Sequence, residues 1–279
     1  MEALIEKTKT TYSIHNKHKE PLKLIPYIGC KAGFKHVFDE LIDEKVEKIE
    51  IYDVFGGGGA FSFYMCDRFG SEKVNYNDNN KTVVNLISHL QKNPMELFDG
   101  YQNHYYNSID NDDYFYLIRE KNIEKEIEGA VNFLFLCKNA FSGKIRFNKK
   151  GRFNTPKRKG SRCPKIEWNH LKSLSQTIKY MTITNEDYQY FNRVKNSFIY
   201  LDPPYFNNTN GHYNGVLSLQ EFNSFMRKIE NDNCVMLSEQ NNPEIFNLSS
   251  KYKVFDILLK RSLQYATKKS SCEIIACNY

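Results

Sequence analysis

A short apolar run that ends at two consecutive prolines constrains the fold of this chain more than any other feature. Residues 198–201 (FIYL) have β-forming side chains and predict a buried strand. Pro203 and Pro204 cannot continue a strand or a helix, so the chain must turn there. The turn leaves Asp202 at the carboxyl end of the strand, where open α/β sheets bind ligands, with Tyr205 three positions further on.

The stretch from Asp202 to Tyr205 has two interpretations. Aspartate and proline are common in turns, so it can be an ordinary turn. Alternatively, Asp202 and the carbonyl of Pro203 accept the two N–H bonds of an exocyclic amine, while Tyr205 stacks on the base that carries it. Such acceptors would make the conjugated amine more nucleophilic. The four residues alone do not decide between these interpretations.

Glycines between a strand and a helix form the second feature. Residues 48–55 alternate like a strand, Gly56 to Gly59 follow, and residues 60–69 resume at a helical period. Glycines let a ligand approach the backbone closely, as at the start of a nucleotide-binding βαβ unit. The run is not the usual dinucleotide fingerprint, and consecutive glycines satisfy parts of many patterns.

Acidic residues follow two further predicted strands. Asp78 ends the strand 73–77 and can bind the ribose hydroxyls of an adenosine, or else cap the helix predicted over 81–91. Asn79 or Asn80 could supply that cap instead. After the strand predicted over 180–184, Glu186 or Asp187 could face the same ligand.

Lys31 precedes a helix predicted over 35–43 and has a glycine on either side, Gly29 and Gly33. A lysine at a helix entrance is well placed to meet an anion such as a carboxylate. An ordinary loop is the alternative.

The order of elements predicts an α/β fold. Strands alternate with helices, which specifies a predominantly parallel, doubly wound sheet. The other predicted elements are helices over 112–121, 126–138, 168–177 and 219–229, and strands over 234–238, 253–257 and 273–277. The polar first 20 residues are expected to be flexible.

A basic segment is the best indication of a nucleic-acid partner. Residues 138–162 contain ten lysines and arginines and no acid, with Phe141, Phe147 and Phe153 among them. Residues 145–147 and 152–153 around Gly151 predict a β-hairpin. A solvated charged loop is the alternative, but a cationic ribbon can enter a DNA groove. There its lysines would meet phosphates, and one or two of Arg146, Asn148, Arg152 and Asn154 would meet base edges.

Composition excludes other classes of protein. The chain has 39 Lys+Arg against 33 Asp+Glu, a net charge of +6 that permits a polyanionic partner. Seven cysteines without a C-x-x-C pair argue against a disulfide framework or a zinc knuckle, and we expect no metal. With no signal peptide and no long apolar run, we expect a cytoplasmic, nucleoid-associated protein without membrane contact.

Together these parts resemble the S-adenosylmethionine-dependent DNA adenine-N6 methyltransferases of the Dam type, from Pro26 to Tyr279. Tyr27 to Lys31 is similar to the family's PYxGxK segment, Val54 to Phe61 resembles its first cofactor motif, and DPPY is intact. The hairpin pattern R-x-N-x-x-G-x-F-N-x-P, the most specific match, runs from Arg146 to Pro156. Residues 138–143 and 157–159 depart from the family pattern, so the target sequence cannot be carried over.

The resemblance implies a Rossmann-like class I methyltransferase sheet, mostly parallel with an antiparallel terminal strand, plus a small helical and β-hairpin target-recognition domain. The expected division is a catalytic domain at 21–92 and 166–279, an inserted domain at 93–165 and a flexible N-terminus at 1–20. The catalytic residues implied are Asp202, Pro203, Pro204 and Tyr205. The cofactor-binding residues implied are Tyr27, Lys31, Asp53, Phe55, Gly56, Gly57, Gly58, Asp78 and Asp187. The DNA-binding residues implied are Lys138, Asn139, Lys144, Arg146, Asn148, Arg152, Asn154, Lys157 and Arg158.

The implied activity is methyl transfer from S-adenosylmethionine to N6 of a flipped-out adenine in double-stranded DNA, within a restriction-modification system or alone. The expected partners are DNA and a cognate restriction endonuclease, and the expected state is a monomer or weak dimer. Two other functions stay open: methylation of an RNA adenine or a protein glutamine, and DNA binding without catalysis.

Overall fold

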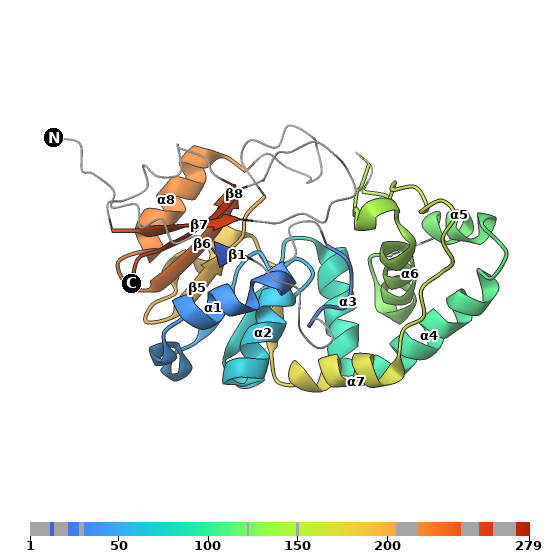
Figure 1. Cartoon of the computed structure of the whole chain (residues 1–279), viewed down its shortest axis with the longest axis horizontal. Coiled ribbons are helices and arrows are strands. Elements are labelled where there is room, and N and C mark those ends of the chain that lie inside the picture. Colours follow the sequence, from blue (N-terminus) through green and yellow to red (C-terminus); the bar gives the residue numbers. More distant parts are fainter. Residues whose placement is uncertain are drawn as a thin grey trace.

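The computed structural model contains a twisted sheet covered by helices and a helical lobe at one end (Figure 1). The structure describes residues 12–13, 22–27, 31–121, 123–148, 151–204, 217–240, 251–258 and 272–279. Within these residues the sheet has eight strands in the order β1-β7-β8-β6-β5-β2-β3-β4. The strands are β1 (Tyr12–Ser13), β2 (Ile51–Asp53), β3 (Val74–Asn77), β4 (Thr182–Thr184), β5 (Phe198–Leu201), β6 (Cys234–Gln240), β7 (Lys253–Leu258) and β8 (Cys272–Cys277).

The pairing of the strands confirms the predicted fold class. β8 runs antiparallel to both of its neighbours, β6 and β7, and all other pairs are parallel. The antiparallel strand β8 is therefore not an edge strand, because it lies between β6 and β7. β1 pairs with β7 through Tyr12 and Ser13, so these two residues belong to the sheet although the sequence predicted a flexible N-terminus.

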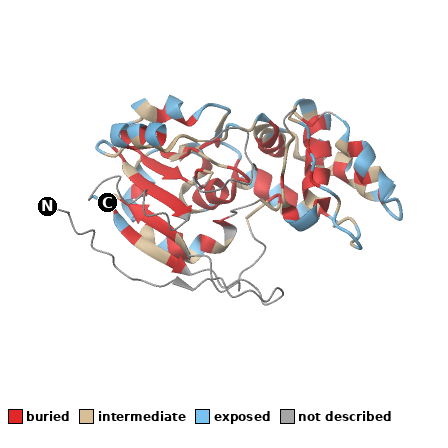
Figure 2. Ribbon diagram, turned by 90° about the horizontal axis from the view of Figure 1, so that it is seen from above, coloured by how far each residue is buried: buried red, intermediate tan, exposed pale blue. Residues whose placement is uncertain are grey.

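Residues of β5 alternate between the two faces of the sheet, as the period of a strand requires. Phe198 and Tyr200 belong to one buried cluster, and Ile199 and Leu201 belong to the other. All four residues are buried, which explains why this strand reads as a continuous apolar run. Figure 2 shows the strands buried along most of their length, with exposed residues on the outward sides of the helices.

Helices cover both faces. On one side α8 (Leu219–Ile229) and the 3-10 helix η5 (Tyr188–Arg193) pack on the cluster that includes Ile199. The other side carries α1 (Lys35–Leu41), α2 (Ala60–Phe69), α3 (Lys81–Lys92) and α7 (Trp168–Thr177). Within the described residues, no helix is long and apolar enough to span a membrane.

The lobe consists of α4 (Pro94–Asn107), α5 (Asp113–Arg119), α6 (Glu126–Asn139) and the basic segment that follows. The sequence analysis predicted α5 and α6 but not α4. At Gly100 of α4, an added Cβ would lie 2.6 Å from a methyl group of Val131, so the glycine lets α4 approach α6 closely. Buried His104 connects α4 to α5 and α6, because its two ring nitrogens form hydrogen bonds with the Tyr114 hydroxyl and the Asn132 amide oxygen at 2.9 Å each.

Candidate active site

Three aspartates meet at the carboxyl edge of the sheet. Asp53 is the last residue of β2 and aligns with Tyr76 of β3 on one side and Tyr200 of β5 on the other. Asp78 and Asp202 each follow two positions after these partners, so the three carboxyl groups come from adjacent strand ends. The negative charges of Asp202 and Asp78 both act on Asp53 and raise its pKa, which supports their proximity. Asp78 and Asp202, which the sequence analysis assigned to strand ends, thus follow the strands on either side of β2.

Asp53 is a buried carboxyl group with one unused oxygen. Its Oδ2 accepts a hydrogen bond of 2.6 Å from the Ser62 hydroxyl, whereas the buried Oδ1 has no hydrogen-bond partner. Burial is the main cause that raises the pKa of Asp53 to about 7, and the Ser62 hydrogen bond opposes it. A buried acceptor left in this state favours a cationic hydrogen-bond donor from a ligand.

Asp202 is held by a lysine from a distant part of the chain. Lys31 Nζ donates to Oδ1 at 2.9 Å and to Oδ2 at 2.8 Å, and it also lies 3.5 Å from Oε2 of Glu273. Burial raises the pKa of Asp202 to about 6, with Lys31 pulling it down. The structure thus places Lys31 on the Asp202 carboxylate, whereas the sequence analysis expected it to meet a ligand anion. Glu273, on β8, was not predicted.

The glycine turn is held firmly by β3. Gly56 N donates to Asn77 O at 2.7 Å, Gly59 N donates to Gly56 O at 2.8 Å, and the Tyr76 hydroxyl donates to Gly57 O at 2.8 Å. Gly57 has a φ of +48°, and a Cβ there would lie 2.9 Å from the Tyr27 ring. The ring of Tyr27 therefore lies against the turn, as the similarity of residues 27–31 to a cofactor motif implies.

The sequence left open whether Asp78 or a neighbouring asparagine caps α3. Asn80 caps α3, because its Oδ1 accepts from Thr82 N at 3.0 Å. The Asp78 carboxylate accepts from Gly57 N and Asn80 N, at 2.7 Å each, and burial raises its pKa despite these bonds. Asp78 thereby fixes the shape of the glycine turn and lies beside it.

Asn77 is a structural residue of the site that sequence reasoning missed. Its amide nitrogen donates to the carbonyls of Val54 and Glu186 at 3.0 Å each, and its oxygen accepts from the Thr184 hydroxyl and Glu186 N. One side chain thus connects the ends of β2, β3 and β4. The sequence signal that could have indicated this role is an asparagine at the end of a predicted strand.

The remaining predicted residues differ in position. The Phe55 ring stacks on Tyr188 with centroids 5.7 Å apart, beside the turn. Asp187 is exposed and caps η5 by accepting from Gln189 N at 2.9 Å. Pro203 is buried and Pro204 half-buried, while Tyr205 lies outside the described residues.

The basic segment forms the predicted hairpin. Asn154 N donates to Arg146 O at 2.9 Å and Asn148 N donates to Arg152 O at 2.8 Å, with Gly151 in the turn at a φ of +74°. Phe147 and Phe153 pack against Phe133 of α6 and so anchor the hairpin to the lobe. Phe141, in contrast, is 50% exposed.

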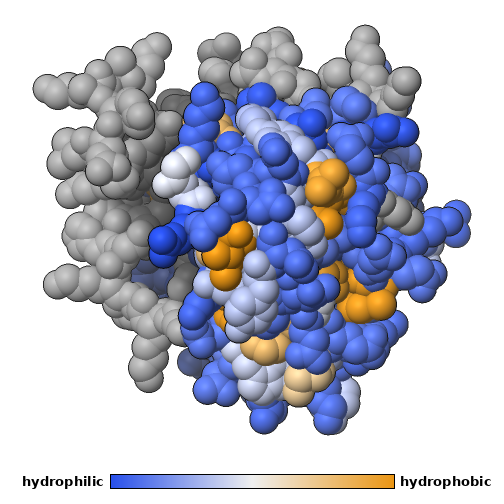
Figure 3. Space-filling model, turned by 90° about the vertical axis from the view of Figure 1, so that its right-hand side faces the viewer, coloured by the Kyte–Doolittle hydropathy of each residue, from blue (hydrophilic) through white to orange (hydrophobic). Residues whose placement is uncertain are grey.

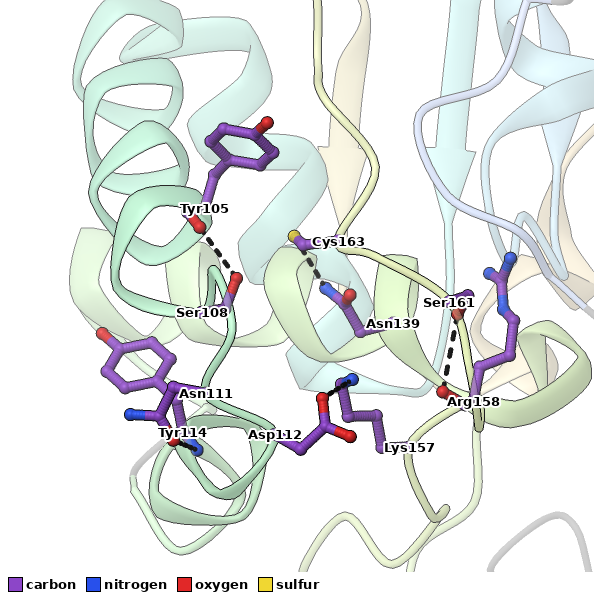
Figure 4. A network of polar contacts seen from close by, with 10 residues as sticks. All are labelled: Tyr105, Ser108, Asn111, Asp112, Tyr114, Asn139, Lys157, Arg158, Ser161 and Cys163. Carbon is purple, nitrogen blue, oxygen red and sulfur yellow. Dashed lines mark hydrogen bonds and ion pairs between the residues drawn. The ribbon is translucent and has the colours of Figure 1, made fainter.

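Acids from α5 and its flanks approach the hairpin, which the local sequence did not reveal. Lys157 Nζ lies 2.5 Å from Asp112 Oδ1 (Figure 4). Arg152 Nη1 lies 3.8 Å from Glu120 Oε2. The ten positive charges are therefore partly compensated. Figure 3 shows that this end of the molecule is mainly hydrophilic, with separate hydrophobic spots.

The predicted DNA-binding side chains are not equally accessible. Arg152, Asn154 and Arg158 are exposed, and Lys144, Arg146 and Asn148 are half-buried. Half-buried Lys138 has its pKa lowered to about 8 by burial and by the nearby charge of Lys23. Asn139 is buried, and its amide donates to Phe135 O at 2.8 Å and to Cys163 Sγ at 3.3 Å, so its position lends no support to a DNA contact (Figure 4).

The segment Pro26–Tyr27 lies between the lobe and the glycine turn and is close to both. Gly143, with a φ of +62°, lies so close to Pro26 that a Cβ would be 2.7 Å from the proline ring. Pro26 immediately precedes Tyr27, whose ring lies on Gly57. No group of three or more metal-ligating side chains occurs within the part of the chain that the structure describes.

The sheet order and the glycine turn beside three strand-end aspartates define a class I methyltransferase. The chain belongs to the D12 class N6 adenine-specific DNA methyltransferases, which residues 27–267 match. Members of this family use S-adenosylmethionine. The protein is therefore an adenine-specific DNA methyltransferase, with DNA as its substrate.

Curated relatives agree with this membership. The chain is 27% identical to the type II methyltransferase M.MjaIII of Methanocaldococcus jannaschii, over 92% of this chain and 100% of the relative. It is 25% identical to the type II methyltransferase M1.LlaDCHI of Lactococcus lactis subsp. cremoris, over 67% of this chain and 68% of the relative. It is also 24% identical to the type II methyltransferase M.CviBI of Paramecium bursaria Chlorella virus NC1A, over 65% and 68%.

Proposed function

We propose that the chain methylates N6 of an adenine extruded from double-stranded DNA at a specific sequence, with Asp202 as the acceptor for the amine. The position of Asp202 at the same edge of the sheet as Asp53 and Asp78 supports this proposal, because it puts an amine acceptor beside a glycine turn of the cofactor-binding type. Asp202 and the Pro203 carbonyl hold the two N–H bonds, and Tyr205 stacks on the ring.

The residues at the turn fit S-adenosylmethionine. Asp53 Oδ1 is a buried acceptor without a partner, and it suits the ammonium group of the methionine part. In this proposal Gly56 to Gly58, Tyr27 and Phe55 supply a close-fitting surface, and Asp78, which lies beside the turn, binds the ribose hydroxyls. When bound, the cofactor supplies a sulfonium-activated methyl group, so the protein mainly needs to align the acceptor nitrogen with it. Asp187, exposed at the end of β4, is the outermost candidate contact.

The pH dependence of methyl transfer is the first prediction. The pKa of Asp202 is raised to about 6, so the carboxylate that accepts N–H bonds is present above that pH and is lost as the pH falls through it. The single-turnover rate at saturating cofactor is expected to drop below pH 6. Asp202→Asn cannot titrate and should give a lower rate without this inflection. An unchanged inflection in Asp202→Asn would assign it to another group.

The hairpin and its lobe bind DNA in this proposal. Cations on phosphates provide affinity, and the exposed polar side chains of the hairpin contact base edges. Lys138, Lys144, Lys157 and Arg158 are the phosphate candidates, and Arg146, Asn148, Arg152 and Asn154 are the base-edge candidates. Lys157 must exchange Asp112 for a phosphate.

Arg152→Gln tests the hairpin. Loss of one cationic contact should weaken DNA binding and, if that contact is to a phosphate, reduce the slope of log K against log salt by about 0.9. A base contact would instead relax sequence preference at one position. The control is Lys228→Gln, which changes an exposed residue of α8, a helix at the opposite end of the molecule from the lobe (Figure 1). Equal effects of both variants would exclude a specific role for the hairpin.

Labelled-methyl assays on DNA, RNA and protein test the substrate class directly. Label on RNA or protein alone would support methylation of an RNA adenine or a protein glutamine. If calorimetry detected no binding of S-adenosylmethionine, the result would support a non-catalytic DNA-binding protein. N6-methyladenine sequencing of DNA from cells that express the chain would report the target. The type II relatives lead us to propose a cognate restriction endonuclease. We further propose a cytoplasmic, nucleoid-associated location and action as a monomer or weak dimer.

A further inference from the structure

A buried lysine lies between two carboxylates next to the amine site. Lys31 Nζ contacts both oxygens of Asp202 at 2.9 and 2.8 Å and lies 3.5 Å from Oε2 of Glu273. The Lys31 side chain is 3% exposed and that of Glu273 is 12% exposed. One ammonium group therefore faces two anions, with Asp202 as the nearer partner.

This arrangement competes with the role of Asp202. An ammonium group on both carboxylate oxygens withdraws electron density from the groups that must accept the adenine N–H bonds. It would also repel the amine nitrogen, which gains positive charge as the methyl group arrives. Lys31 must consequently give up at least part of its contact with Asp202 when the base enters.

A buried ammonium group cannot be left without a counter-charge, because desolvation makes an unpaired charge very unfavourable. Among the described residues, Glu273 is the second acid that lies near the Lys31 ammonium group. It belongs to β8, where it aligns with Gln240 of β6 and Ile257 of β7, so the sheet fixes its backbone. A small shift of the Lys31 side chain would make Glu273 the nearer partner.

We propose that Glu273 is a positioning residue for adenine methylation, which takes over Lys31 when the target base binds Asp202. The inference rests on the amine-binding role proposed for Asp202. Glu273 touches neither substrate nor cofactor and acts through the lysine. Without it, Lys31 remains on Asp202 and opposes entry of the base.

Glu273→Gln provides the test, because it removes the charge and keeps the size. With 2-aminopurine at the target position and saturating S-adenosylhomocysteine, fluorescence reports extrusion of the base. We expect base extrusion and the single-turnover rate on normal DNA to fall about tenfold, with cofactor affinity by calorimetry unchanged. Glu273→Asp should restore much of the loss.

Two further variants separate this effect from loss of structure. In Lys31→Met/Glu273→Gln the competing cation is gone, so base extrusion should equal that of Lys31→Met alone. Asp256→Asn changes an acid on the adjacent strand β7 and should affect neither measurement. Thermal melting shows whether each variant folds. If Glu273→Gln does not fold, base extrusion in Glu273→Asp and in Lys31→Met/Glu273→Gln tests the inference instead.

Base extrusion and rate unchanged in Glu273→Gln would overturn the inference. Weaker cofactor binding with unchanged extrusion would also overturn it, since Lys31 would then exchange Asp202 for the methionine carboxylate. Full activity of Asp202→Asn and Asp202→Ala would instead refute the proposed role of Asp202.

Discussion

Replacing Asp202 by alanine is expected to abolish methyl transfer to DNA while S-adenosylmethionine still binds. The substitution removes the acceptor that orients the adenine amine and raises its nucleophilicity, and losing such a group typically costs about 100- to 1000-fold in rate. The side chains assigned to the cofactor, Asp53 and Asp78, stay in place on β2 and after β3. Single-turnover transfer of labelled methyl groups and calorimetry with cofactor measure the two quantities separately.

Lys31 complicates the interpretation of this variant. Removing Asp202 leaves the buried ammonium group with only the longer contact to Glu273 among the two acids near it, and breaking a buried pair can cost about 3–5 kcal/mol of stability. Lys31→Met/Asp202→Ala removes both charges and should regain stability without regaining activity. Methyl transfer by either folded variant at the original rate would rule out the assigned role.

Gly56→Ala is expected to destroy the cofactor turn. The new Cβ would lie 2.2 Å from the Tyr76 ring and 3.0 Å from the Asn77 carbonyl oxygen. The ring cannot yield freely, because Tyr76 is completely buried and its hydroxyl holds Gly57 O. We expect a loss of about 1–3 kcal/mol of stability from overpacking. Cofactor affinity, measured by calorimetry, should fall by at least the same free energy.

Gly160→Ala is the matched control. This glycine has a φ of +66°, and a Cβ there would meet no atom within 4 Å. The substitution therefore costs backbone strain of about 1–2 kcal/mol without a clash, far from the turn. Its cofactor affinity should equal that of the unmodified protein. Equal cofactor affinity in Gly56→Ala would show that the turn is not where the cofactor binds.

Elements with strong local signals could be predicted from sequence. The helix over 60–69 has its predicted bounds because Gly59 and Gly70, with φ of +79° and +94°, flank it. The strand over 198–201 also has its predicted bounds, since two prolines follow shortly after it. The parallel order of strands then brought Asp53, Asp78 and Asp202 to one edge.

Helix α4 was missed because its local signals are poor. It contains a glycine, a histidine, three tyrosines and two asparagines, most of which have low helix propensity. Its stability comes from the buried stripe of Leu97, Tyr101 and His104 and from close packing on α6. These are tertiary contacts, which override propensity and cannot be read from one segment.

The charges of the site depended on tertiary contacts as well. Lys31 precedes Asp202 by 171 residues, and nothing local indicates that they pair. Glu273 reaches the same lysine only because β8 turns back into the sheet between β6 and β7. Likewise, Asp112 neutralises Lys157 from across a 45-residue separation. Sequence reasoning found the cations and Asp202, but it found neither Glu273 and Asp112 nor the pairs that these groups form.

The contact of Gly143 with Pro26 has a consequence for how the two ligands influence each other. A sideways displacement of the loop at Gly143 pushes the proline, and the next residue is the tyrosine whose ring covers the glycine bend. Under the proposed function, the peptide step from Pro26 to Tyr27 would therefore link DNA binding by the lobe to cofactor binding at the glycine turn. Thermodynamic reciprocity requires that, if a bound duplex tightens the grip on the methyl donor, the donor must tighten the grip on the duplex by the same factor.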